Sequence, residues 1–258
     1  MNNQKLIMES WRRFLNESVD RDKLCLFIHS GKNRAKKLIL YNIVDPSAEN
    51  IKNLDFTSAL EIVSGISISH TEDFGFPCVP QTYQVDTVAT AEKYEGQGFQ
   101  KLMMDFSFLV AEMFRSGLTS DHIVGTKAGA ARAWNKIENT FDKNGEDIQP
   151  GTSSEYEVQK TPEGNYKFDY KEKTPDPDDD CNMGHNPDEL ATDYSFRKKD
   201  AMSVKPLMDK MRKNHEDFEK LLASQAKDSA RILQVFRREL IAMEDDNFSY
   251  MYMGAYDE

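Results

Sequence analysis

The chain has 258 residues, of which 39% are hydrophobic and 30% charged, a balance typical of a globular protein. Its formal net charge is −11, and residues 142–194 hold fifteen acidic side chains against five lysines, so the negative charge is concentrated in one segment. This argues against a nucleic-acid-binding protein, because phosphate contacts need clustered Lys and Arg.

The N-terminal third predicts a helix followed by strands. Residues 1–20 place apolar side chains such as Trp11 and Phe14 on one helical face, which indicates an amphipathic helix or leader. The polar segment 45–55 interrupts the apolar runs and is expected to be a connection. Strands are expected where apolar and β-branched residues gather between turn signals, at 23–29, 37–44, 59–70 and 83–90.

The middle of the chain changes to helical spacing. Helices are predicted at 99–114 and 128–137, with a short strand at 122–125 between them, and a hairpin of 156–159 with 166–170. The order predicts an α/β (α+β) fold, with a mixed, mostly antiparallel sheet of six or seven strands and helices on both faces. This core is expected to span residues 21–172.

An acidic loop is expected at 173–200, followed by a helical segment with an aromatic tail at 201–258. The loop does not match a calcium site, because Cys181 replaces the required Gly and Pro187 the terminal Glu, so no metal is expected. From Val204 to Met243 an apolar stripe predicts a long helix, or two helices with a break at 224–228. The stripe would pack inside the molecule, and its length leaves self-association open.

The sequence carries no signal for secretion, a membrane span or a disulfide framework. It has three cysteines, which is too few and an odd number for a disulfide framework. It has no run of about 18 apolar residues. We therefore expect a cytoplasmic protein without a membrane partner.

The most informative stretch is 85–100, where an apolar strand leads through a Gly-x-Gly turn directly into an apolar helix. Glycines let a phosphate approach the backbone, and the first free N–H groups of the helix point toward it with the positive end of the helix dipole. The turn therefore predicts a cradle for a pyrophosphate.

The run Tyr94-Glu95-Gly96-Gln97-Gly98-Phe99-Gln100 resembles the Q/R-x-x-G-x-G/A motif of the GNAT superfamily of N-acetyltransferases. Glu95 falls on the first motif position, Gly98 on the central glycine and Gln100 on the last. The Ala-rich residues 130–137 are similar to a late helix of that family.

The resemblance implies an acetyl-CoA-dependent N-acetyltransferase acting on an unidentified amine. The strand and turn would bind the cofactor through Val88, Ala89, Thr90, Lys93, Tyr94, Gly96, Gln97, Gly98, Phe99 and Gln100. An amide of residues 88–90 would polarise the thioester, and Glu92 or Asp86 would take the proton of the amine. Trp134 stands where the family usually has the Tyr that protonates the thiolate.

Two departures from the family favour an alternative. Glu95 puts a negative charge beside the expected pyrophosphate, and Trp134 cannot act as an acid comparable to Tyr. The alternative is a catalytically inactive GNAT-like protein that serves as a binding or structural module. A third hypothesis is an acidic scaffold whose segment 142–194 mimics nucleic acid toward a basic partner.

The first residues carry a weaker resemblance. Ile7-Met8-Glu9 and Leu15-Asn16-Glu17 look like the cleavage sites of head-targeting leaders in internal proteins of tailed bacteriophages. This resemblance implies a bacteriophage-encoded, virion-associated protein.

Overall fold

The computed structural model describes residues 23–31, 34–71, 82–121, 128–142, 144–148, 155–161, 164–165, 192, 194–226 and 228–253. Several predicted features lie outside these residues. They are the N-terminal helix of 1–20, the strand at 122–125, the strand at 166–170, most of the acidic loop and the end of the aromatic tail.

Within the described residues, seven strands form one sheet in the order β1-β2-β3-β4-β5-β9-β6. Neighbouring strands run antiparallel, except that β4 and β5 are parallel. This confirms the predicted mixed, mostly antiparallel sheet. The strands are β1 Leu24–Ser30, β2 Lys36–Ile43, β3 Leu60–His70, β4 Thr82–Thr90, β5 Gly117–Thr119, β6 Tyr156–Val158 and β9 Phe196–Lys198, and a separate hairpin joins β7 Lys160–Thr161 to β8 Gly164–Asn165.

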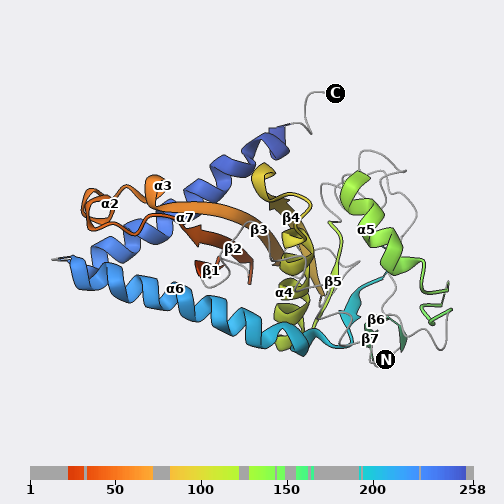
Figure 1. The fold of residues 1–258 in the computed structure, drawn as a ribbon. Helices are drawn as coiled ribbons and strands as arrows, with labels where there is room; N and C mark the ends of the chain where they lie inside the picture. Colours follow the sequence, from red (N-terminus) through yellow and green to blue (C-terminus); the bar gives the residue numbers. More distant parts are fainter. Residues whose placement is uncertain are drawn as a thin grey trace, which may run out of the picture.

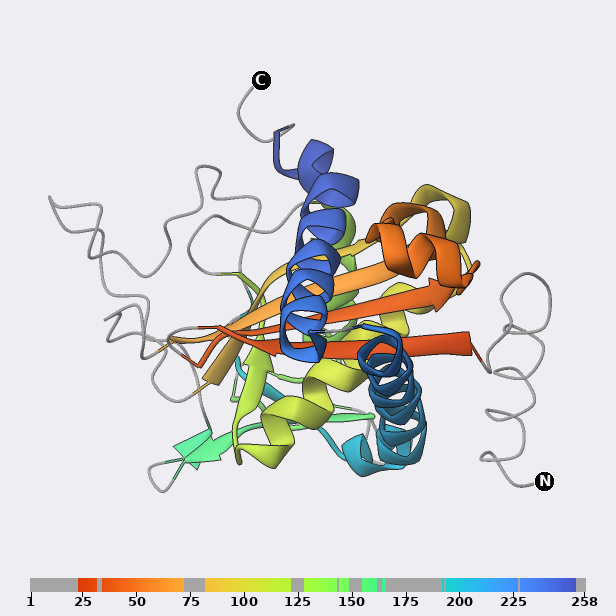
Figure 2. The same cartoon turned by 90° about the vertical axis from the view of Figure 1, so that its left-hand side faces the viewer.

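Helices cover both faces of this sheet, as predicted. The helices are α2 Ala48–Asn53, α3 Phe56–Ala59, α4 Phe99–Met113, α5 Ala128–Glu138, α6 Lys205–Gln225 and α7 Ser229–Met253, with 3₁₀ turns η3 Glu92–Tyr94 and η5 Ala201–Val204. Figure 2 shows the strands between α7 on one side and α4 on the other. The α4 face and the α7 face each bury an apolar cluster, because the side chains of each strand alternate between the two faces.

Helix α6 lies along the outer strand β1 and contributes to both clusters (Figure 1). The side chain of Asn214 donates a hydrogen bond of 2.8 Å to the Leu24 carbonyl. An exposed strand edge invites pairing with other chains, and α6 covers part of this one.

The C-terminal apolar stripe packs within the molecule. The helical structure is interrupted between Gln225, where α6 ends, and Ser229, where α7 begins, which confirms the predicted break. The buried members of the stripe are Met208, Met211, Phe218, Leu222, Ile232, Phe236 and Leu240. Because these side chains form part of the core, self-association would have to use other surfaces of α6 and α7.

Three local differences from the sequence analysis concern short elements. The three-residue strand β5 was not predicted, and the short helix α2 occupies part of the expected connection at 45–55, with α3 directly after that connection. Strand β9 lies within residues 173–200, so the sheet extends beyond residue 172. Short elements carry too few residues for a recognisable period.

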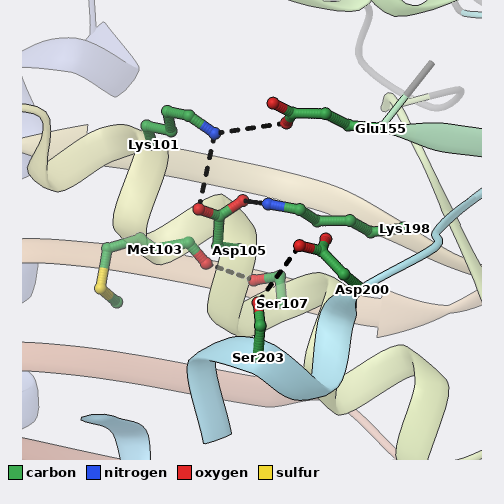
Figure 3. Close-up of polar contacts among 8 residues, drawn as sticks. All are labelled: Lys101, Met103, Asp105, Ser107, Glu155, Lys198, Asp200 and Ser203. Atoms are coloured by element: carbon green, nitrogen blue, oxygen red, sulfur yellow. Dashed lines mark hydrogen bonds and ion pairs between the residues drawn. The ribbon is translucent and has the colours of Figure 1, made fainter. Parts of the chain in front are cut away.

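A buried ion pair fastens α4 to β9 (Figure 3). The Lys198 Nζ lies 2.6 Å from Asp105 Oδ1, and their side chains are only 7% and 2% exposed. The Lys101 Nζ lies 3.5 Å from the other carboxylate oxygen of Asp105 and also reaches Glu155 at 3.9 Å. The central carboxylate thus faces two cations.

Gly117 in β5 permits a close approach of β9. A Cβ at this position would collide with Ser195 Oγ and Gln159 Oε1, and it would lie 3.0 Å from the Phe196 carbonyl oxygen. Because this carbonyl belongs to the backbone, it cannot rotate away.

We expect Gly117→Ala to destabilise the protein by about 1–3 kcal/mol through overpacking, as measured by urea unfolding. Gly31→Ala is the matched control, because its Cβ would meet Ala35 Cβ at an ordinary 3.5 Å. Equal unfolding midpoints for the two variants would contradict the close packing at β5.

Candidate functional site

Strand β4 changes its pairing halfway along its length. Its first three residues pair with β5, from Thr82 opposite Gly117 to Gln84 opposite Thr119. Residues 85–90 pair with β3 on one side, and no described strand pairs with them on the other. We call residues 85–90 on this side the open edge, meaning that no described strand pairs with them there, and such an edge can bind an extended ligand by β-strand addition.

Asp86 occupies a bulge at the point where β4 leaves β5. On β3, Ser67 is opposite Thr87 and Ile68 is opposite Val85, so Asp86 is the extra residue. Its Oδ1 accepts hydrogen bonds from Ser69 Oγ at 2.6 Å and from Gln84 Nε2 at 2.9 Å. The bulge thus places a half-buried carboxyl group among the first residues of the open edge.

The surroundings of Asp86 make its carboxyl a weaker acid than that of an ordinary Asp. The pKa of this carboxyl is raised to about 6, because burial, the largest cause, and the charge of Asp121 raise it more than the hydrogen bonds from Ser69 and Gln84 lower it. A carboxyl with a pKa near 6 is suited to general base catalysis at neutral pH. Ser69 and Asp121 were not predicted, because nothing in the sequence shows the register that brings them to Asp86. Gln84 was not predicted either, although its place two residues before Asp86 on one strand is a signal that the two side chains share a face.

The two glycines before α4 both adopt left-handed backbone conformations, with φ of 71° at Gly96 and 75° at Gly98. Gly98 is the N-cap of α4, and no side chain caps this terminus. A Cβ on Gly96 would meet nothing within 4 Å, so the space above the turn is open. The first N–H groups of a helix have no intrahelical acceptor, so the turn has the features of an anion site.

Glu61 of β3 fixes this turn in place. Its carboxylate accepts a hydrogen bond of 2.6 Å from Lys93 Nζ and another from the Tyr94 hydroxyl. Partial burial would raise the pKa of Glu61, but these two hydrogen bonds outweigh it and the pKa is lowered. Glu61 lies 32 residues before Lys93 and belongs to no motif, so nothing in the sequence pointed to it.

The other predicted cofactor residues of the turn differ in their burial. Tyr94 and Phe99 are buried, with ring centroids 6.0 Å apart, and hold the turn on the core. Gln97 is half-buried, and its Nε2 donates a hydrogen bond of 3.2 Å to the Lys93 carbonyl. Gln100 is exposed at the start of α4.

The middle of β4 contributes to both faces of the sheet. Val88 packs against the cluster on the α4 face, and Ala89 belongs to the cluster on the α7 face. The side chain of Thr90 hydrogen-bonds to Ser64 Oγ at 3.0 Å. These side chains are engaged in packing, so a ligand on this stretch would meet the backbone edge.

Two predicted catalytic residues lie in contrasting places. Glu92 is exposed at the start of η3. Trp134 is buried on α5, with its ring centroid 6.4 Å from those of Phe108 and Phe196. These contacts give Trp134 a packing role, and Asp86 is the candidate base that the structure places beside the open edge.

The described residues lack a metal-binding cluster and a membrane-spanning helix. They contain no group of three or more His, Cys, Asp or Glu side chains that could hold a metal ion. No helix in the described part of the chain is long and apolar enough to span a membrane. Comparison with protein-family models, curated proteins and solved structures finds no match for this chain.

Proposed function

We propose that the protein is an acyl-CoA-dependent N-acyltransferase, with acetyl-CoA as the donor and an amine as the acceptor. The observation that carries this proposal is the open edge of β4 at residues 85–90, which begins at Asp86 and leads into the uncapped helix α4. The edge suits the extended, amide-bearing pantetheine arm, and the helix terminus suits the pyrophosphate.

The chemistry follows from the order of these groups along β4. The amine nitrogen attacks the thioester carbonyl carbon, so that a C–N bond forms and the C–S bond breaks. An amide of residues 88–90 would stabilise the negative charge on the carbonyl oxygen. The carboxylate of Asp86 would accept the proton of the amine, and the CoA thiolate would take a proton from water.

The cofactor site is tested by calorimetry with acetyl-CoA. We expect micromolar binding to the wild type, and a Kd at least about tenfold weaker for Gly96→Leu, a loss of about 1.4 kcal/mol. The new side chain would enter the open space above the turn, where a Cβ meets no neighbour within 4 Å. Gly96→Asn keeps a residue that tolerates the positive φ of 71°, so its smaller side chain shows how much of the loss comes from backbone strain. Gly31→Leu, in the turn after β1, is the control and should bind as the wild type does.

Unchanged binding by Gly96→Leu would contradict the position of the site, and a wild type that binds no acetyl-CoA would contradict the function.

The second candidate function is a non-catalytic acyl-CoA-binding module. The packing of Trp134 in the core favours it, because this position then supplies no acid for the thiolate. Binding without release of free CoA thiol, across a panel of amines, would establish that candidate.

A further inference from the structure

A buried histidine connects the C-terminal helices to the sheet. His215 of α6 is 7% exposed, and its Nδ1 lies 2.9 Å from the Tyr41 hydroxyl of β2. Its Nε2 lies 3.2 Å from Glu219 Oε1. Arg237 of α7 donates from Nε and Nη2 to the two oxygens of Glu219, at 2.7 and 2.8 Å. One continuous chain of polar contacts thus joins β2, α6 and α7.

The neutral form of His215 satisfies this chain completely. The Tyr41 hydroxyl can donate to Nδ1 while Nε2–H donates to Glu219. A protonated ring donates from both nitrogens, so the Tyr41 hydroxyl would have to turn its proton toward Cys25, whose sulfur is a weak acceptor. Protonation therefore reverses the hydrogen bond between the ring and Tyr41 and leaves the hydroxyl proton of Tyr41 with a weaker acceptor.

The packing around the ring keeps water away from it, which makes a positive charge costly. The ring centroid of His215 lies 5.1 Å from that of Phe27 in β1 and 5.9 Å from that of Phe236 in α7. The titratable and charged groups around it are Glu216 and Glu219 on α6, Arg237 on α7, Tyr41 on β2, and Cys25 with the exposed His29 on β1.

These surroundings shift the titration of His215. Burial lowers its pKa most strongly, the charge of Glu219 raises it, and the charge of Arg237 lowers it, with a net lowering. An open state with an exposed ring would titrate near 6.5 and bind the proton more readily. The stabilisation that the neutral ring gives to the packing of α6 and α7 is thus fully present above about pH 6.5. It decreases as the pH falls below this value.

We propose that His215 is an acid-sensitive latch, whose neutral ring holds the α6–α7 pair on the sheet and whose protonation loosens this pair. The pair packs on the α7 face, whereas α4 and its cluster hold the other face of the same strands. Ala89 of β4 belongs to the cluster beneath α7, so the latch would also uncover one side of the open edge. The latch itself does not depend on the proposed acyl transfer.

Hydrogen exchange at several pH values tests the latch, after correction for the intrinsic exchange rates. Below pH 6.5 we expect the opening constant of α6 and α7 to rise by up to about tenfold per pH unit, while β2 and β3 stay protected. His215→Gln can accept from Tyr41 and donate to Glu219 without titrating, so it should flatten this dependence. His29→Gln is the control and should retain it.

Two results would overturn the latch. One is a pH dependence in His215→Gln equal to that of the wild type, and the other is joint opening of the sheet with the helices. Titration of the wild-type imidazoles by NMR gives a check that does not require a variant to fold. We expect His215 to titrate below the ordinary 6.5 of a histidine, and titration at or above that pH would contradict the proposal.

Discussion

Asp86→Asn is expected to make the protein more stable at neutral pH and to remove most of its acyl transfer. The folded state raises the pKa of this carboxyl from 3.8 to about 6, so its ionised form is held at a cost in the native protein. Asn would still accept the hydrogen bonds from Ser69 and Gln84 but carries no charge. We expect a gain of about 1–3 kcal/mol at pH 7.5, and a loss of about 10²–10⁴-fold in kcat.

The gain in stability should itself depend on pH. Because the pKa of Asp86 is raised in the folded state, the cost is small near pH 4 and complete above pH 6. The gain at pH 5 should therefore be about 1.4 kcal/mol smaller than at pH 7.5, as measured by urea unfolding. An equal gain at both pH values would show that the carboxyl is not perturbed.

The exposed carboxylate of Glu92 provides the matched control. Glu92→Gln removes the other predicted base but changes only an exposed side chain, so its stability should stay within about 0.5 kcal/mol of the wild type. Its rate of acyl transfer should be close to that of the wild type. A variant of Glu92 that loses activity while Asp86→Asn keeps it would reverse the assignment of the base.

Asp105→Ala is expected to cost about 3–5 kcal/mol, the largest loss of stability among the changes considered, because it leaves Lys198 buried without its partner. The double variant Asp105→Leu and Lys198→Met removes both charges and should recover most of this loss. Chemical unfolding of the three proteins measures both effects.

Lys101 supplies the control for this pair. Its side chain is 53% exposed and its Nζ lies 3.5 Å from Asp105, so Lys101→Ala should cost no more than about 1 kcal/mol. A cost for Asp105→Ala no greater than that of Lys101→Ala would mean that the pair between α4 and β9 contributes little to the fold.

The sequence predicted the parts of the fold that have a strong local pattern. The strands from 23 to 90 alternate or run apolar between clear turn residues, and α4 and the α6–α7 pair repeat their apolar residues at helical spacing. The 3-residue strands β5 and β9 have no such pattern, and their place in the sheet depends on pairing with distant residues. The parallel pairing of β4 with β5 arises from tertiary structure in the same way.

The candidate site was predictable only where it follows the chain. Gly96 and Gly98 predict a turn from the sequence alone, because glycine tolerates the positive φ that both adopt. Asp86 was a candidate by its position on β4, but its raised pKa depends on Ser69 of β3 and on the bulge, neither of which has a sequence signal. Glu61 was not predicted either, because it reaches Lys93 and Tyr94 only through tertiary structure. Trp134 was assigned a catalytic position by resemblance, and its place in the core follows from contacts with Phe108 and Phe196.

The most direct test of the central claim is the hydrogen exchange of single amides with and without saturating acetyl-CoA. The account predicts added protection at residues 85–90 and at the first amides of α4, with little change in β1 and β2. Acetyl-CoA that leaves these amides unprotected, or protects a different part of the chain, would contradict the claim that the open edge of β4 binds the donor.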